Sequence, residues 1–242
     1  AGVRLATAKR GGVTVTRVEI TREGLARPRG RYVTLEMPSV SVLDERDTDV
    51  IETGAAELRA LLPPEGPVLV LGIGNRRVTA DALGPRTAQK ILVTMGPQHT
   101  LPVQGIRPVA ALAPGVSGDT GLTLRQLAAA MVDAVRPAAL ICVDSLCSAE
   151  AARLGRTIQF SDTGLHPADA RHARHLDAAA LGVPVIAAGI PTLMDADEGA
   201  DLVLTPRALD SVIAHGSALL AGILNRALQP RLSVAQLCWL TG

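Results

Sequence analysis

The feature that most constrains the fold is a run of apolar, mostly β-branched residues, PVLVL at 67–71, without polar alternation. Such a run predicts a strand buried on both faces, as in a parallel sheet covered by helices. Gly72 and Gly74 then allow a sharp turn, and Pro85 fits the first position of a helix, where a missing N–H is tolerated. The predicted buried stripe of this helix consists of Ala88, Ile91, Leu92 and Met95. The segment therefore predicts a strand, a loop and a helix, in that order.

Strands and helices continue to alternate along the 242 residues. Alternating polar and apolar residues predict that 13–20 and 32–37 pair as an antiparallel extension. The other predicted strands are 109–113, 140–144, 157–160 and 183–189, and the other predicted helices are 45–62, 122–135, 172–181 and 206–226. This order favours an α/β fold, a three-layer α/β/α sandwich with a mostly parallel sheet and a small N-terminal β extension. We expect one domain over 1–242, with a β-hairpin extension at 1–40, an α/β core at 41–226 and a tail at 227–242.

Two aspartates follow predicted strands at equivalent positions. Asp81 lies in the loop after the first buried strand, and Asp144 ends the apolar run in PAALICVDSLCS, residues 137–148. In open α/β sheets, ligands bind outside the carboxyl ends of the strands. Each aspartate alone is also explained as a solvated turn residue or a helix cap. If the two strands are neighbours, the carboxylates share one crevice and their pKa values are pushed apart, which suits activation of water and protonation of a leaving amine.

Other polar residues close to these strand ends are candidate auxiliary groups. Asn75 and Thr79 flank the loop that carries Asp81, and they either orient it or donate to a developing oxyanion, or serve turn chemistry alone. Ser117 lies in the glycine-containing loop 114–121. That loop either holds a substrate backbone by its N–H groups or simply connects a strand to a helix.

The segment SDTGLHP supplies three more candidates. We expect Asp162, Thr163 and His166 to line the same crevice, with His166 as an auxiliary acid, an orienting group or a metal ligand, or else as a loop residue bonded to backbone. Asp195 is a possible third acid, although a helix N-cap is the simpler interpretation. A basic cluster that either meets an acidic substrate or is only solvated consists of Arg171, His172, Arg174 and His175.

Several long segments, in order along the chain, resemble the germination protease family. They are VEITREGL (18–25), GRYVTLE (30–36), GIGNRRVTADALGP (72–85), APGVSGDTG (113–121), ICVDSL (141–146), TIQFSDTGLHP (157–167) and GVPVIAAGIPTLMDA (182–196). The resemblance implies an endopeptidase of spore-forming bacteria that degrades small acid-soluble spore proteins when the spore germinates. It places the family's two proposed catalytic aspartates on Asp81 in TADALGP and Asp144 in VDSL. It also implies a homotetramer, a zymogen form, and a location in the cytoplasm of the forespore or spore core.

The chain departs from the family pattern in four places. It begins at Ala1, after the stretch that holds the family's acidic propeptide, so we expect a trimmed form or a shortened relative. The loop 166–175 is shorter than in the family and lacks its glycines, and TGLTL places Thr123 where the family has a glutamate. The long C-terminal region of the family is reduced to a tail that ends PRLSVAQLCWLTG.

Two alternatives to a cofactor-free aspartate mechanism remain open. In the first, a metal-dependent peptidase similar to the hydrogenase maturation endopeptidases, which resemble this family in fold, holds a divalent ion with Asp81, Asp144 and His166. No HExxH or other specific metal motif accompanies these residues. The second alternative is a folded but inactive relative.

Composition excludes several other classes of protein. A net charge of +1 and only three aromatic residues give no reason to expect nucleic-acid binding. No apolar run approaches 18 residues, so no membrane span is expected. The three cysteines, Cys142, Cys147 and Cys238, are odd in number and lack CxxC spacing, which favours a reducing cytoplasm over a disulfide scaffold.

Overall fold

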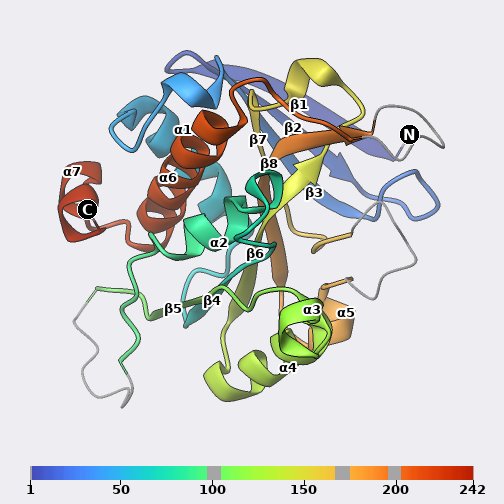
Figure 1. Cartoon of the computed structure of the whole chain (residues 1–242), viewed down its shortest axis with the longest axis vertical. Helices are drawn as coiled ribbons and strands as arrows, with labels where there is room; N and C mark the ends of the chain where they lie inside the picture. Colours follow the sequence, from blue (N-terminus) through green and yellow to red (C-terminus); the bar gives the residue numbers. More distant parts are fainter. Residues whose placement is uncertain (1, 97–104, 167–174, 196–202, 242) are drawn as a thin grey trace.

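The computed structural model describes residues 2–96, 105–166, 175–195 and 203–241. Its strands form a nine-stranded sheet in the order β1-β2-β3-β7-β8-β6-β4-β5, and β9 pairs with β8 outside this path. Figure 1 shows the sheet passing from β1–β3 at the top of the view to β4 and β5 at the lower left. The strands are Val3–Arg10 (β1), Val13–Ile20 (β2), Gly30–Glu36 (β3), Val68–Gly72 (β4), Val109–Leu112 (β5), Ala139–Cys147 (β6), Thr157–Ser161 (β7), Val185–Asp195 (β8) and Val203–Leu204 (β9).

The sheet has a parallel half and an antiparallel half. Strands β8, β6, β4 and β5 are parallel neighbours, whereas β1, β2, β3, β7 and β8 are joined by antiparallel pairs. The predicted α/β class is confirmed, and the predicted pairing of 13–20 with 32–37 is observed between β2 and β3. Parallel pairing is confined to the core strands, because short connections such as that between β1 and β2 produce antiparallel neighbours.

Helices cover both faces of the parallel half, as expected for three layers. On one face lie α1 (Thr48–Leu61), α2 (Leu83–Ala88) and α6 (Leu209–Leu228), and α7 (Val234–Thr241) packs on α6. The opposite face carries α4 (Leu124–Val135) and α5 (Ala178–Leu181), and α4 is preceded by α3 (Ser117–Thr120). The short 3-10 turns are η1 (Val40–Val42), η2 (Thr79–Asp81) and η3 (Ala151–Arg153).

Two hydrophobic cores result from the alternation along the buried strands. Val68 and Val70 of β4 belong to the core beneath α1 and α6, whereas Leu69 and Leu71 belong to the core beneath α4. Both sets are almost fully buried. The unbroken apolar run at 67–71 is thus explained, since each face of this strand meets helices.

The helix predicted after this strand is shorter than expected. Helix α2 ends at Ala88, and Pro85 is its third residue rather than its first. The reason is a buried amide on α6: Asn225 donates through Nδ2 to the carbonyl of Lys90 and accepts through Oδ1 from the N–H of Leu92, both at 2.9 Å. These bonds satisfy backbone groups that would otherwise need the next turn of helix.

Three other elements differ from the prediction. Strand β1 was not predicted, because its exposed residues lack an apolar face. Helix α7 lies in the predicted tail 227–242. The predicted helix 172–181 is observed only as α5, and its residues 172–174 lie outside the described part of the chain. Strands β6 and β8 continue beyond their predicted ends because each pairs with the other.

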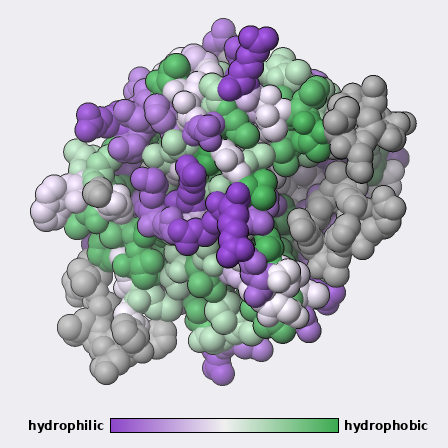
Figure 2. Space-filling view, viewed as in Figure 1, coloured by the Kyte–Doolittle hydropathy of each residue, from purple (hydrophilic) through white to green (hydrophobic). Residues whose placement is uncertain are grey.

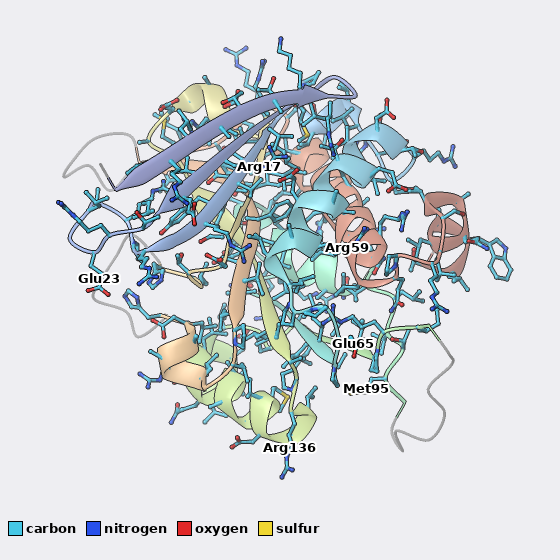
Figure 3. All side chains as sticks on the ribbon, turned by 180° about the vertical axis from the view of Figure 1, so that it is seen from behind. Arg17, Glu23, Arg59, Glu65, Met95 and Arg136 are labelled. Carbon is cyan, nitrogen blue, oxygen red and sulfur yellow. The ribbon has the colours of Figure 1, made fainter. Side chains whose placement is uncertain are left out.

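An ion pair connects strand β2, in the N-terminal part of the sheet, to helix α1. Arg17 of β2 makes two hydrogen bonds to Glu57 of α1, and its Nε lies 2.6 Å from Oε2. Figure 3 shows Arg17 between the strands and α1. The carboxylate of Glu57 is buried, and the hydrogen bond to it raises the pKa of Arg17. The antiparallel strands are therefore fixed to the same core as the parallel ones.

Helix α6 is long and apolar enough to cross a membrane, and it is the only such helix in the described part of the chain. Of its most apolar window, 72% is buried inside the protein. This burial is typical of the central helix of a folded core.

Candidate active site

The loop that follows β4 is pressed against the end of β6. The N–H of Ile73 donates to the carbonyl of Val143 at 2.8 Å, so the chain stays beside β6 after β4 ends. Gly84 in the first turn of α2 touches both strands. A Cβ at this glycine would lie 2.2 Å from the carbonyl oxygen of Ile73 and 2.3 Å from that of Val143. Only glycine allows this approach, which brings the loop and α2 over the carboxyl ends of β4 and β6.

Asp81 is held in this loop by backbone contacts. Its Oδ2 accepts a hydrogen bond from the N–H of Asn75 at 2.7 Å. Gly74, at φ +124°, faces the main chain of Asp81, and a Cβ there would lie 2.0 Å from the Asp81 carbonyl oxygen. From β8, the buried Thr192 donates its hydroxyl to the carbonyl of Ala80 at 2.9 Å. These contacts fix a half-buried Asp81 at the carboxyl end of the sheet.

The two residues predicted to flank Asp81 take different parts in the loop. Asn75 orients Asp81 through its backbone N–H, while its side-chain oxygen accepts from the N–H of Arg77 at 2.9 Å. Thr79 begins η2, and its carbonyl accepts from the N–H of Ala82 at 3.1 Å. Local turn chemistry thus accounts for the Asn75 side chain and for the Thr79 backbone.

Asp144 lies within β6, on the strand adjacent to β4. It is half-buried, and its Oδ1 accepts from the N–H of Ser145 at 2.8 Å. It directly follows Val143, to which the Asp81 loop is bonded. The structure therefore places Asp81 and Asp144 at the same end of two neighbouring parallel strands.

The next residue along β6 carries an unsatisfied group. The hydroxyl of Ser145 is buried and has no hydrogen-bond partner among the described residues. Its side chain points to the opposite face of the sheet from Asp144, because successive strand residues alternate.

Ser117 begins α3, close to the Asp81 loop. Arg77 of that loop approaches Asp119 of α3 at 3.8 Å, between two exposed side chains. Ser117 itself is exposed. Figure 2 shows hydrophilic side chains gathered over the middle of the face where α2 and the preceding loop lie, and the exposed residues there include Arg76, Arg77 and Arg86.

Asp162 is not brought to this end of the sheet. Strand β7 runs antiparallel to β8, and Gln159 is level with Gly189 and hence with Asp144. Asp162 lies three residues further along, so its backbone is about 10 Å back along the strands and about 10 Å across them from Asp144. Its carboxylate is paired with Arg31, which donates from its backbone N–H at 2.6 Å and from Nε at 2.7 Å.

His166 lies in the segment that follows β7. Its Nε2 donates to the carbonyl of Thr163 at 2.7 Å, and its Nδ1 lies 3.1 Å from Nδ1 of His175. Because a carbonyl only accepts, Nε2 of His166 carries the proton of the first contact, and the second contact joins the two rings. The interpretation of His166 as a loop residue bonded to backbone matches this geometry.

The residues of the metal alternative are not gathered at one point. Within residues 2–96, 105–166, 175–195 and 203–241, no group of three or more His, Cys, Asp or Glu side chains is arranged to hold a metal ion. Arg171, His172 and Arg174 of the predicted basic cluster lie outside the described residues. Asp195 is the last residue of β8 rather than a helix N-cap.

Two positioning residues were not predicted from the sequence. Gly84 and Thr192 lie in the segments TADALGP and IPTLMDA, which were singled out for other residues. No local pattern indicates that Gly84 contacts two strand ends or that Thr192 reaches Ala80, which is 112 residues away along the chain.

The sequence of this chain is similar to the sequences of known proteases. A family model described as germination protease matches residues 1–198. The protein named germination protease in Clostridium perfringens strain SM101 is 32% identical over 278 residues, which covers 91% of this chain and 86% of that protein. The germination protease of Caldanaerobacter subterraneus is 41% identical over 200 residues, covering 76% of this chain and 61% of that protein. The germination protease of Bacillus velezensis is 38% identical over 223 residues, which covers 85% of this chain and 58% of that protein.

Among solved structures, a [NiFe] hydrogenase maturation protease HycI from Thermococcus kodakarensis KOD1 aligns with a TM-score of 0.46. The sequence identity is 16%, and the alignment covers 71% of this chain and 98% of that structure.

Proposed function

Because this chain belongs to the germination protease family and is an endopeptidase, we propose that it degrades small acid-soluble spore proteins during germination, with Asp81 and Asp144 as the catalytic pair. The observation that supports the pair is their position at the carboxyl ends of the adjacent parallel strands β4 and β6. This end of an open α/β sheet is where ligands bind.

The proposed chemistry needs one carboxylate and one carboxylic acid. One member of the pair takes a proton from water as the water attacks the peptide carbonyl, and the other gives a proton to the leaving amine. Two carboxyl groups that share a site are suited to this division, because they do not both ionise readily. The backbone donors at Asn75 and Ser145 each hold one oxygen of an aspartate and thereby limit its rotamers.

The finer assignments belong to the same proposal. Asn75, Thr79 and Ser117 are proposed contacts of the substrate near the pair. Asp162 and His166 are assigned to local structure, because their side chains bond to Arg31 and to the carbonyl of Thr163. The chain is proposed to act as one peptidase domain over 1–242 within a homotetramer, in the cytoplasm of the forespore or spore core. It is also proposed to derive from a zymogen.

Cleavage of a purified small acid-soluble spore protein tests the proposal. We expect the wild-type chain to cleave it, and we expect Asp81→Asn and Asp144→Asn each to reduce kcat by roughly 10²–10⁴-fold, the typical contribution of a general acid or base. Asp162→Asn is the matched control. It removes a charge of the same type at a distance from the pair, and kcat should change less than about threefold.

Circular dichroism must show that each variant is folded. Full activity in both folded Asn variants would end the dyad hypothesis. The same assay with a strong chelator separates the alternatives. Activity that survives chelation supports the metal-free mechanism, and activity lost on chelation and restored by added Zn²⁺ supports a metal-dependent peptidase.

A further inference from the structure

A row of polar side chains crosses the sheet from Asp144 to the outer edge. The register aligns Asp144 of β6 with Gly189 of β8, then with Gln159, Thr34, Thr16 and Thr7 on β7, β3, β2 and β1. Directly paired residues project to the same face of a sheet. The last four of these, Gln159, Thr34, Thr16 and Thr7, are called the cross-strand row below.

The cross-strand row lies on a face that is only partly covered. Gln159, Thr34 and Thr16 are half-buried and Thr7 is exposed. Beside the row on the same face, Leu5 of β1 has 69% of its surface exposed. Figure 1 shows α4 and α5 at the lower part of the molecule, beside the parallel strands, and β1–β3 at the top. The opposite face of β1–β3 is occupied, because Arg17 and Val33 project there toward the core beneath α1.

The chemistry of the row suits a polypeptide backbone. Three hydroxyls and one amide both donate and accept hydrogen bonds, so they can pair with peptide N–H and C=O groups whatever the substrate side chains. Gly189 has no side chain, and a Cβ there would lie 2.3 Å from the carbonyl oxygen of Asp144. The side chain of Leu146 of β6 covers this position, because its Cγ would lie 2.7 Å from the same Cβ. A chain that runs from Asp144 to Gln159 therefore passes over Leu146.

Resting on the proposed function, we propose that the cross-strand row is a substrate-binding track, which holds an extended polypeptide on one side of the scissile bond. Five strand spacings separate β6 from β1. At about 4.8 Å each they span about 24 Å, which matches about seven residues of extended chain. The partner is thus an unfolded or loosely folded protein, bound through its backbone and cut where it meets Asp144.

Substrate length provides the first test. The scissile bond in a small acid-soluble spore protein is mapped by mass spectrometry, and three peptides are made: one with ten residues on each side of the bond and two that keep only two residues on one side. We expect one truncation to raise KM by roughly tenfold and the other to have a much smaller effect. Equal KM values for all three peptides would overturn the track.

Substitution of the row provides the second test. The double variant Thr16→Val/Thr34→Val preserves shape and removes two hydroxyls. We expect it to raise KM for the long peptide by roughly tenfold, with kcat changed less than twofold, as for uniform binding. KM for the sensitive truncated peptide should stay unchanged. The matched control is Thr14→Val on the same strand and face, one step outside the row; an equal effect there would contradict a specific track.

Binding separates this inference from the proposed catalysis. The long peptide, labelled with fluorescein, is titrated against Asp144→Asn and against Asp144→Asn/Thr16→Val/Thr34→Val by anisotropy. A roughly tenfold higher Kd in the triple variant supports the track even if the wild-type chain cleaves nothing. In that case only the proposed function fails. An identical Kd, or no binding to either variant, overturns the track while leaving any observed cleavage to stand.

Discussion

The backbone N–H of Asn75 donates to Oδ2 of Asp81 at 2.7 Å. The preceding residue, Gly74, packs against the main chain of Asp81. The carboxylate is therefore oriented by main chain that directly follows β4. Its position depends on the backbone path through the turn, to which the Asn75 side chain contributes by accepting from the N–H of Arg77.

Substitution of the turn glycine should disturb Asp81. Gly74→Ala places a Cβ 2.0 Å from the Asp81 carbonyl oxygen, at a φ of +124° that L-residues rarely adopt. We expect a loss of about 2–4 kcal/mol in the free energy of unfolding and at least a tenfold fall in kcat. Urea denaturation and peptidase assays measure both. Gly118→Ala is the control, since a Cβ there meets nothing within 4 Å and the residue is helical; comparable losses in the control would contradict the explanation.

The orphaned hydroxyl beside Asp144 should be dispensable. Ser145→Ala removes a buried polar atom that has no partner among the described residues. We expect the free energy of unfolding to rise by up to about 1–2 kcal/mol, because the desolvated hydroxyl no longer has to be buried. Thermal denaturation followed by circular dichroism measures the change. A marked loss of stability would indicate that the hydroxyl has a bonding role.

The ion pair between the N-terminal strands and α1 should matter to stability. Arg17→Met leaves the buried carboxylate of Glu57 without its cation, and we expect the free energy of unfolding to fall by about 1–3 kcal/mol. This loss is smaller than for a fully buried ion pair, because Arg17 is partly exposed. Arg17→Met/Glu57→Leu should recover much of this loss. Arg4→Met breaks the exposed pair with Glu19 and should change stability by less than about 0.5 kcal/mol. Unfolding is best followed by circular dichroism, because the single tryptophan, Trp239, is 83% exposed in the native state.

The buried amide on α6 should be more important than its neighbours on the same helix. Asn225→Leu leaves the carbonyl of Lys90 and the N–H of Leu92 without their partner, and we expect a loss of about 2–4 kcal/mol. His215→Leu, at an exposed position of α6, is the matched control and should change stability by less than about 0.5 kcal/mol. Similar midpoints in urea for the two variants would show that the amide bonds are not needed.

Cysteine labelling should follow burial. Burial, with a smaller contribution from the charge of Asp144, raises the pKa of the Cys142 thiol, so this thiol stays protonated at pH 8. Cys147, in contrast, is exposed to solvent. We expect iodoacetamide at pH 8 to modify Cys147 first and Cys142 only after denaturation. Mass spectrometry of tryptic peptides reads this order. Modification of Cys142 in the native protein at a rate near that of Cys147 would refute the expectation.

Elements with a strong periodic or unbroken apolar signal were predicted well. The buried strand at 67–71 and the amphipathic helix at 45–62 are observed as β4 and α1 within a few residues, because each is stabilised by burial that its own pattern encodes. Strand β1 was missed since it is an exposed edge strand held by β2. The helix after Pro85 was overextended because Asn225, 140 residues further along, supplies bonds that end it.

For the candidate pair too, local pattern predicts some features and long-range contacts decide the others. The apolar runs alone predict that Asp81 and Asp144 come where strand burial ends, because an acid after an apolar run marks that point. Asp144 itself lies inside β6, which continues to Cys147. Three features appear only in the folded molecule: β4 and β6 are neighbours, Gly84 packs over both, and antiparallel β7 carries Asp162 away from the pair. The reason is physical: strand ends are encoded locally by hydrophobicity, whereas strand order and direction follow from long-range pairing that no local pattern specifies.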